Sequence, residues 1–201
     1  MDLLDKYKKT WNNQPEEAHK LSKVEIYKMA HSKSTSIVKW IFIIGMLEFL
    51  TIIPFLFMET DTKHFEEMNI LWLRKALDTI SCAIVAFFVI KFYLNYKSIS
   101  SLDNTKTLMD KIVKTRRTVR NYIFTGLSFF AIAILVMAFS SINNQFINET
   151  PIFKIGIIAI FIFIGAIFLG LFWLFYQLLY GILLKKLNKN YKELAKLDEL
   201  N

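Results

Sequence analysis

The 201-residue chain has few of the residues that interrupt helices, with 6 glycines and 3 prolines. Its one cysteine, Cys82, excludes an intramolecular disulfide. The short motifs of common enzyme sites are absent as well: there is no glycine-rich phosphate loop, no GxSxG, no HExxH and no CxxC. We therefore expect no enzymatic reaction, no metal site and no cofactor.

Long apolar runs are what the chain has in abundance. Hydrophobic residues make up 54% of it, and 19 residues are phenylalanine. Four continuous runs each approach or exceed the roughly 20 residues that cross about 30 Å of hydrocarbon as a helix. The runs cover residues 38–58, 77–96, 122–140 and 152–184. Because they are continuous rather than alternating, they predict an all-α polytopic membrane protein with four transmembrane helices.

The distribution of lysine and arginine predicts the orientation of these spans. Eight of the 25 lie in residues 1–39, eight in 91–120 and five after residue 184, which leaves four for the other two connections. By the positive-inside rule, both termini and the central connection are cytoplasmic in a bacterial inner membrane. This topology accounts for most of the net charge of +8. Since no nucleic-acid recognition motif accompanies the charge, we expect no nucleic-acid partner. A signal peptide is not expected either, because mostly polar residues precede the first run.

The N-terminal cytoplasmic segment, residues 1–37, carries helical signals of its own. Leu4, Tyr7 and Trp11 fall on one face of a short amphipathic helix. Ser22 and Glu25 form a capping box, which predicts a second helix that starts at Ser22 and continues into the first span. The candidate residues for binding a partner are Leu4, Tyr7, Trp11 and Tyr27.

The other cytoplasmic segments, 97–121 and 185–201, have similar apolar stripes. In the central connection the stripe contains Leu108, Ile112 and Val119, on a helix capped by Ser101 or Asp103. The fourth apolar run is so long, roughly 50 Å, that it must tilt or project into the cytoplasm. Its extension carries a stripe of its own, formed by Leu187, Tyr191, Leu194 and Leu197. Three interpretations remain open: the stripes pack on one another, dock a separate protein, or lie on the lipid surface.

A single acid interrupts the first apolar run. Glu48 lies about 13 Å further along the helix than Lys39, which predicts a position near the bilayer centre with no cation at its depth. Asp78 and Ser81 lie on the second span. Because an apolar environment disfavours a charged carboxylate, we expect Glu48 to be neutral and to donate a hydrogen bond to Ser81 or a backbone carbonyl.

Glu48 has three possible roles. It can join helices within this chain, move protons or ions, or contact a partner's membrane helix. Tyr176, Gln177 and Tyr180 either line a polar site or anchor an interface. Elsewhere on the fourth span, Ala166 and Gly170 form a small-xxx-small pair that predicts close approach of another helix.

Three stretches carry a resemblance to a known group of proteins: LLDKYKKTWNNQ, KLSKVEIYKMAHSKSTSIVKWIFIIGMLEF and YKSISSLDNTKTLMDKIVKTRRTVRNY. They resemble uncharacterised four-span inner-membrane proteins of Bacteroidetes, especially flavobacteria. Members are often labelled β-carotene monooxygenase, but such oxygenases hold iron with four histidines. This chain has only His19, His31 and His64, so that chemistry cannot be assembled here. The resemblance also implies a membrane-tethered, anti-sigma-like role, although the zinc-binding pattern of many anti-sigma domains is absent.

The function expected from these features is that of a non-catalytic integral membrane protein. Its cytoplasmic helices would bind or tether a protein partner, in regulation or as an accessory subunit of a membrane complex. The alternative is a small oligomeric transporter or channel that uses Glu48 and Asp78 within the membrane. The expected partners are the lipid bilayer, a protein at the cytoplasmic face or in the membrane, and further copies of this chain.

Overall fold

The computed structural model describes residues 23–57, 71–100, 104–146 and 148–198, and these residues form helices and short connections without a strand. The helices are α2 (Lys23–Phe57), α4 (Leu71–Ser100), α5 (Thr105–Gln145), α6 (Pro151–Tyr176) and α7 (Ile182–Asp198), with one π-helical turn, η1 (Gln177–Gly181), joining the last two. Four stretches are long and apolar enough to cross a membrane: Val24–Pro54, Leu71–Ile99, Thr105–Asn143 and Pro151–Lys196. The prediction of an all-helical chain with four candidate spans is thus confirmed.

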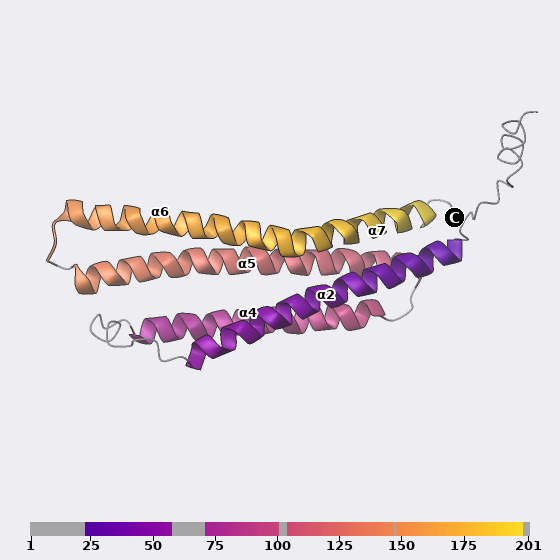
Figure 1. Ribbon diagram of the computed structural model, residues 1–201, viewed down its shortest axis with the longest axis horizontal. Coiled ribbons are helices and arrows are strands. Elements are labelled where there is room, and N and C mark those ends of the chain that lie inside the picture. The colour runs from indigo at the N-terminus through magenta and orange to yellow at the C-terminus, as the bar shows by residue number, and fades with distance from the viewer. Residues whose placement is uncertain (1–22, 58–70, 101–103, 147, 199–201) are drawn as a thin grey trace, which may run out of the picture.

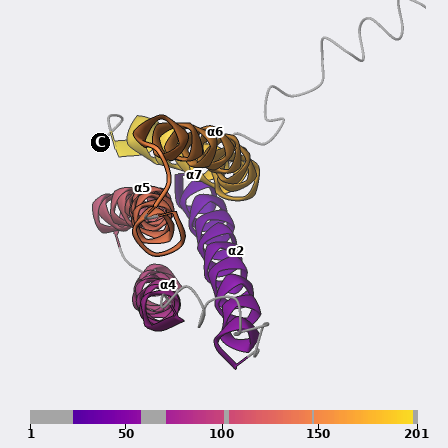
Figure 2. The same ribbon diagram turned by 90° about the vertical axis from the view of Figure 1, so that its left-hand side faces the viewer.

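The helices form an elongated bundle in which α2 runs diagonally (Figure 1). Helix α5 packs against α4, α6 and α7, and α2 packs against both α4 and α7. Seen from the end, α4 and α6 lie on opposite sides of α5, and α2 crosses from the region of α7 towards α4 (Figure 2). The ends that carry the three basic segments gather at one end of the bundle (Figure 1).

The apolar side chains form two cores along the bundle. The first consists of Ile41, Val85, Phe88, Val89, Phe92, Val119, Tyr122 and Tyr180. The second lies towards the basic end and consists of Ala30, Val38, Ile99, Leu108, Ile112, Leu187 and Leu194. The described stripes therefore pack on one another, as the first interpretation predicted. The proposed helix over residues 1–13 and the side chain of Leu197 lie outside the described part of the chain.

Hydrogen bonds join the helices around the second core. The buried side chain of Asn190 on α7 donates a hydrogen bond from Nδ2 to Ser34 Oγ on α2, at 3.1 Å. Thr35 Oγ1 donates to the backbone oxygen of Ile99, at 3.4 Å. Lys111 Nζ donates to the backbone oxygen of Ser98, at 2.7 Å. The last two bonds satisfy carbonyls at the end of α4 that have no partner within their own helix, so they fix α2 and α5 against that end.

The predicted cap of helix α5 was wrong. The N-cap of α5 is Asn104, whose side chain accepts from the Thr107 amide at 2.8 Å, instead of Ser101 or Asp103. Asparagine is as good a cap as aspartate or serine, so composition alone could not choose among neighbouring candidates. Ala166 and Gly170 are exposed, and no helix among the described residues packs at Gly170.

Close helix approach occurs instead at two other glycines. A Cβ atom added to Gly45 on α2 would lie 2.8 Å from a ring carbon of Phe92 on α4. A Cβ added to Gly165 on α6 would lie 3.1 Å from the side chain of Ile134 on α5. The absence of a side chain at Gly45 therefore lets α2 and α4 approach at the first core.

We predict that Gly45→Leu destabilises the protein, because Phe92 is buried and cannot yield the space. Overpacking of this kind costs about 1–3 kcal/mol, which should appear as a lower midpoint of thermal unfolding in detergent. Gly170→Leu is the matched control, since no atom of the described residues lies within 4 Å of a Cβ there. Equal unfolding midpoints for the two variants would contradict the close approach of α2 and α4.

Candidate functional site

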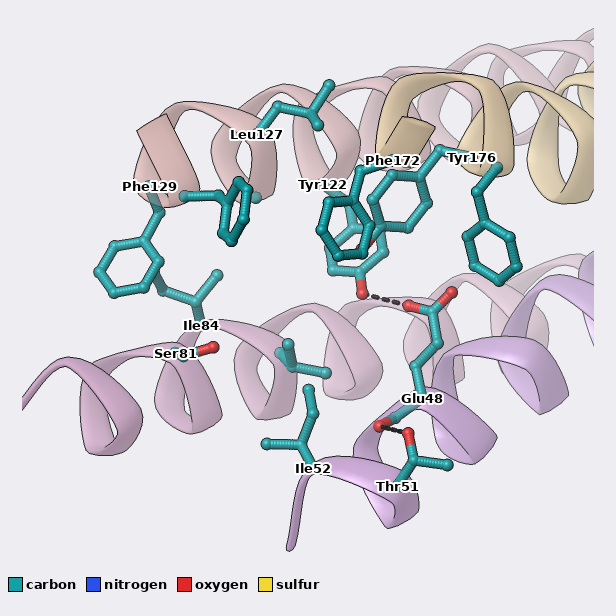
Figure 3. A pocket seen from close by; sticks show the side chains of 14 residues that line it. Glu48, Thr51, Ile52, Ser81, Ile84, Tyr122, Leu127, Phe129, Phe172 and Tyr176 are labelled. Atoms are coloured by element: carbon teal, nitrogen blue, oxygen red, sulfur yellow. Dashed lines mark hydrogen bonds between the residues drawn. The ribbon is translucent and has the colours of Figure 1, made fainter. Parts of the chain in front are cut away.

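Glu48 is bound by two tyrosines from other helices. The hydroxyl of Tyr122 on α5 donates a hydrogen bond to Glu48 Oε2 (Figure 3). The hydroxyl of Tyr180 on η1 donates to Glu48 Oε1, at 3.2 Å. Each carboxyl oxygen thus has a partner, as a polar group removed from water requires. The site joins α2, α5 and η1 through one side chain.

The expected hydrogen-bond partner of Glu48 was wrong. Ser81 lines the same cavity, but the described residues show no hydrogen bond between it and Glu48. Tyr122 follows Arg120 by two residues, and Tyr180 precedes Lys185 by five. The carboxyl group therefore lies near the basic ends of the third and fourth apolar runs instead of their middle. Position along α2 does not give depth, because α2 crosses the other helices diagonally (Figure 2).

Aromatic rings surround the Tyr122 side chain that binds Glu48. The ring of Tyr122 lies 5.3 Å from that of Phe88 and 5.4 Å from that of Phe92, centroid to centroid. The rings of Tyr176 and Tyr180 are each 5.9 Å from it, with near-perpendicular planes. Edge-to-face pairs of this kind add to the stabilisation from burial. They also hold the Tyr122 hydroxyl in place against Glu48.

The π-helical turn η1 sets which residues of the fourth span face Glu48. A π turn adds one residue to the helical repeat, and such turns are frequent at functional sites. Tyr180 is completely buried and contacts Glu48, whereas Gln177 is exposed. A Cβ at Gly181 would lie 3.1 Å from the side-chain carbonyl carbon of Gln177. The sequence singled out Tyr176, Gln177 and Tyr180 but contains no pattern that predicts a π turn.

A cavity of about 350 Å³ lies beside the carboxyl group (Figure 3). Its polar lining comes from Glu48, Thr51, Ser81, Tyr122 and Tyr176. Its apolar lining includes four phenylalanines, Phe129, Phe130, Phe172 and Phe175. Apolar walls with a few convergent polar groups are typical of sites for small molecules.

Asp78 lies in a neighbouring cavity and not with Glu48. This cavity measures about 340 Å³ and shares Ser81, Phe129 and Phe130 with the first. Arg74 pairs with Asp78 at 3.7 Å one turn away on α4. A partly exposed pair of this kind contributes little to stability. Ser81 thus lines both cavities, whereas Glu48 and Asp78 line different ones.

Of the four residues expected to bind a partner, only Tyr27 lies in the described part of the chain. Tyr27 packs against the second core, and its ring lies 6.1 Å from that of His31. Leu4, Tyr7 and Trp11 precede the described residues. Within residues 23–57, 71–100, 104–146 and 148–198, no group of three or more His, Cys, Asp or Glu side chains is arranged to hold a metal ion.

A family model matches residues 24–199, which include the whole Glu48 site and both cores. The chain belongs to the DUF8845 family, a domain of unknown function. The expectation of an uncharacterised family is confirmed to that extent. No curated protein and no solved structure matches the chain. The DUF8845 domain begins after Leu4, Tyr7 and Trp11, so these residues lie outside the matched region.

We predict that Tyr122→Phe lowers the stability of the protein, because it removes a donor from a carboxyl group away from water. A hydrogen bond to such a group contributes about 1–3 kcal/mol, measurable as a lower unfolding midpoint in detergent. Tyr93→Phe is the control, since the side chain of Tyr93 is 46% exposed.

The same substitution in a Glu48→Met background tests the pairing itself. With the acceptor gone, Tyr122→Phe should cost much less than in the wild type, and the difference is the coupling energy. Equal costs in the two backgrounds would show that Tyr122 stabilises the fold through its ring alone.

Proposed function

We propose that the protein crosses a bacterial inner membrane four times with both termini in the cytoplasm. Four sufficiently long and apolar helices support this topology, as does the collection of the basic segments at one end of the bundle. Under this topology, the first core lies at the inner part of the membrane and the second core projects into the cytoplasm.

We further propose that the protein is a non-catalytic scaffold whose cytoplasmic part holds a protein partner. The observation that carries this proposal is the second core, which closes beyond the apolar runs from parts of α2, α4, α5 and α7. The stretch Pro151–Lys196 alone is about 69 Å long at 1.5 Å per residue, more than twice the hydrocarbon thickness. Continuous helices therefore present a packed platform at a set distance from the membrane, as a tethered regulatory protein needs.

The N-terminal segment is the proposed recruiting element. The apolar stripes of the central and C-terminal segments are used within the bundle, and Tyr27 packs there as well. Leu4, Tyr7 and Trp11 are the predicted apolar face of the N-terminal segment. Aromatic and aliphatic side chains on one helical face are common anchors for a partner's groove.

We predict that removal of residues 1–22 abolishes capture of the partner from native membranes while the membrane part still folds. This deletion keeps every described residue of α2, which begins at Lys23. The sharper variant replaces Leu4, Tyr7 and Trp11 by alanine, which should lower recovery about tenfold or more if they act as anchors. Its control replaces Lys6, Lys8 and Lys9 of the same segment by glutamine. If all variants recover the same proteins in the same amounts, N-terminal recruitment is wrong.

Transport around Glu48 is the second candidate function. It is favoured by the cavity of about 350 Å³ beside the carboxyl group and by the adjoining cavity that contains Asp78. An intramembrane acid beside a polar opening can bind and release a proton or cation. Four spans do not readily enclose a pathway, so this function requires several copies. The exposed pair Ala166 and Gly170 on α6 offers a surface for such contact.

For this candidate we predict that Glu48→Gln abolishes proton-coupled flux in proteoliposomes. Glutamine keeps the size and acceptor oxygen of the side chain but cannot exchange a proton. Glu149→Gln should leave flux unchanged, because Glu149 is exposed in the connection between α5 and α6. Flux at the wild-type level from Glu48→Gln, or no flux from the wild type, would remove the transport hypothesis.

A further inference from the structure

A second polar region lies on the opposite face of α5 from Glu48, in a groove of about 510 Å³. One wall is a single face of α5 that contains Arg116, Arg117 and Arg120. The other wall comes from the fourth long helix and includes Trp173 on α6 and Gln177 on η1. The two helices run side by side along this length (Figure 1, Figure 2).

The positive charge of this groove is not paired with a described carboxylate. Arg116 is half-buried, and Arg117 and Arg120 are exposed. Among the residues that the structure describes, no carboxylate forms an ion pair with any of the three. Three guanidinium groups within about one and a half turns present planar donors that match phosphate oxygens. The groove therefore has a site for an anion that the described residues do not fill.

The groove is apolar at its other end. Beyond Arg120 on α5 its lining continues with Ile123, Phe124 and Leu127. The side chains of Phe124 and Trp173 are 73% and 53% exposed. They lie among exposed apolar side chains of α5 and α6, which face lipid under the proposed topology. A ligand that fits the whole groove is thus anionic at one end and hydrocarbon at the other.

The geometry points to a binding site for one anionic phospholipid. Its phosphate contacts Arg116, Arg117 and Arg120, and its acyl chains lie against Phe124, Leu127 and Trp173. A soluble phosphate would leave the apolar part empty. A zwitterionic phospholipid would place its amine among three cations without a carboxylate nearby. Basic pockets between membrane helices at the cytoplasmic side are known to suit anionic head groups.

The test is lipid retention by the purified full chain, measured by native mass spectrometry after exchange in mixed micelles of phosphatidylglycerol and phosphatidylcholine. The wild type should retain one phosphatidylglycerol in preference to phosphatidylcholine. Each arginine beside an anionic head group contributes about fivefold in affinity. The triple variant Arg116→Gln, Arg117→Gln, Arg120→Gln should therefore bind about 100-fold more weakly.

A second triple variant controls for net charge. Lys28→Gln, Lys189→Gln and Lys192→Gln remove the same three charges at exposed positions outside the groove. This variant should retain phosphatidylglycerol as the wild type does. Equal loss in the two triple variants would overturn the proposal in favour of attraction by the whole basic surface. Because Arg117 and Arg120 are exposed, the variant Arg117→Glu, Arg120→Glu provides a charge reversal should the glutamine variant not fold, and it too must lose the lipid.

Two further arms distinguish the source of the phosphate. Inorganic phosphate at millimolar concentration should not displace the bound phosphatidylglycerol, and its competition at that concentration would identify a soluble-anion site. Equal retention of phosphatidylcholine and phosphatidylglycerol would show ordinary surrounding lipid. Either result would refute a specific anionic-phospholipid site.

Discussion

A carboxyl group taken away from water must find hydrogen-bond partners, and Glu48 finds both on other helices. Tyr122 comes from α5 and Tyr180 from the π turn, so one side chain determines where three elements meet. The diagonal course of α2 and the enclosure of the Tyr122 ring by aromatic neighbours are consistent with this requirement. The missing side chain at Gly45, which lets α2 approach Phe92, supports the same arrangement.

The Glu48 site adjoins the first core, which contains Tyr122 and Tyr180, and its helices continue into the second core. Ile37 packs against the first core as well as the second. Helices α2 and α5 pass without interruption from the site to the buried Leu108 and Ile112. A rotation that separated Glu48 from Tyr122 would therefore also disturb the packing of the cytoplasmic part.

Helical periodicity predicted the parts of the fold that depend on one helix at a time. Leu108, Ile112, Val119, Leu187 and Leu194 were expected on apolar stripes, and all are buried. The partners of Glu48 could not be predicted in this way, because depth counted along one helix assumes that it is parallel to its neighbours. The π turn has no composition signal, and the Asn104 cap competes with equally suitable neighbours. Ala166 and Gly170 permit close approach of another helix, but whether a helix packs there depends on how the other helices are arranged.

Within this chain, α6 packs on α5, while the cavity beside Glu48 separates its Phe172 and Tyr176 from Ser81 on α4. The bundle is thus open along one side at the level of the acid. Under the proposed topology that side faces acyl chains, so a molecule would reach Glu48 from the hydrocarbon phase. Access would then depend on how strongly the molecule partitions from water into the membrane. A sparingly soluble compound could occupy the cavity at low aqueous concentration.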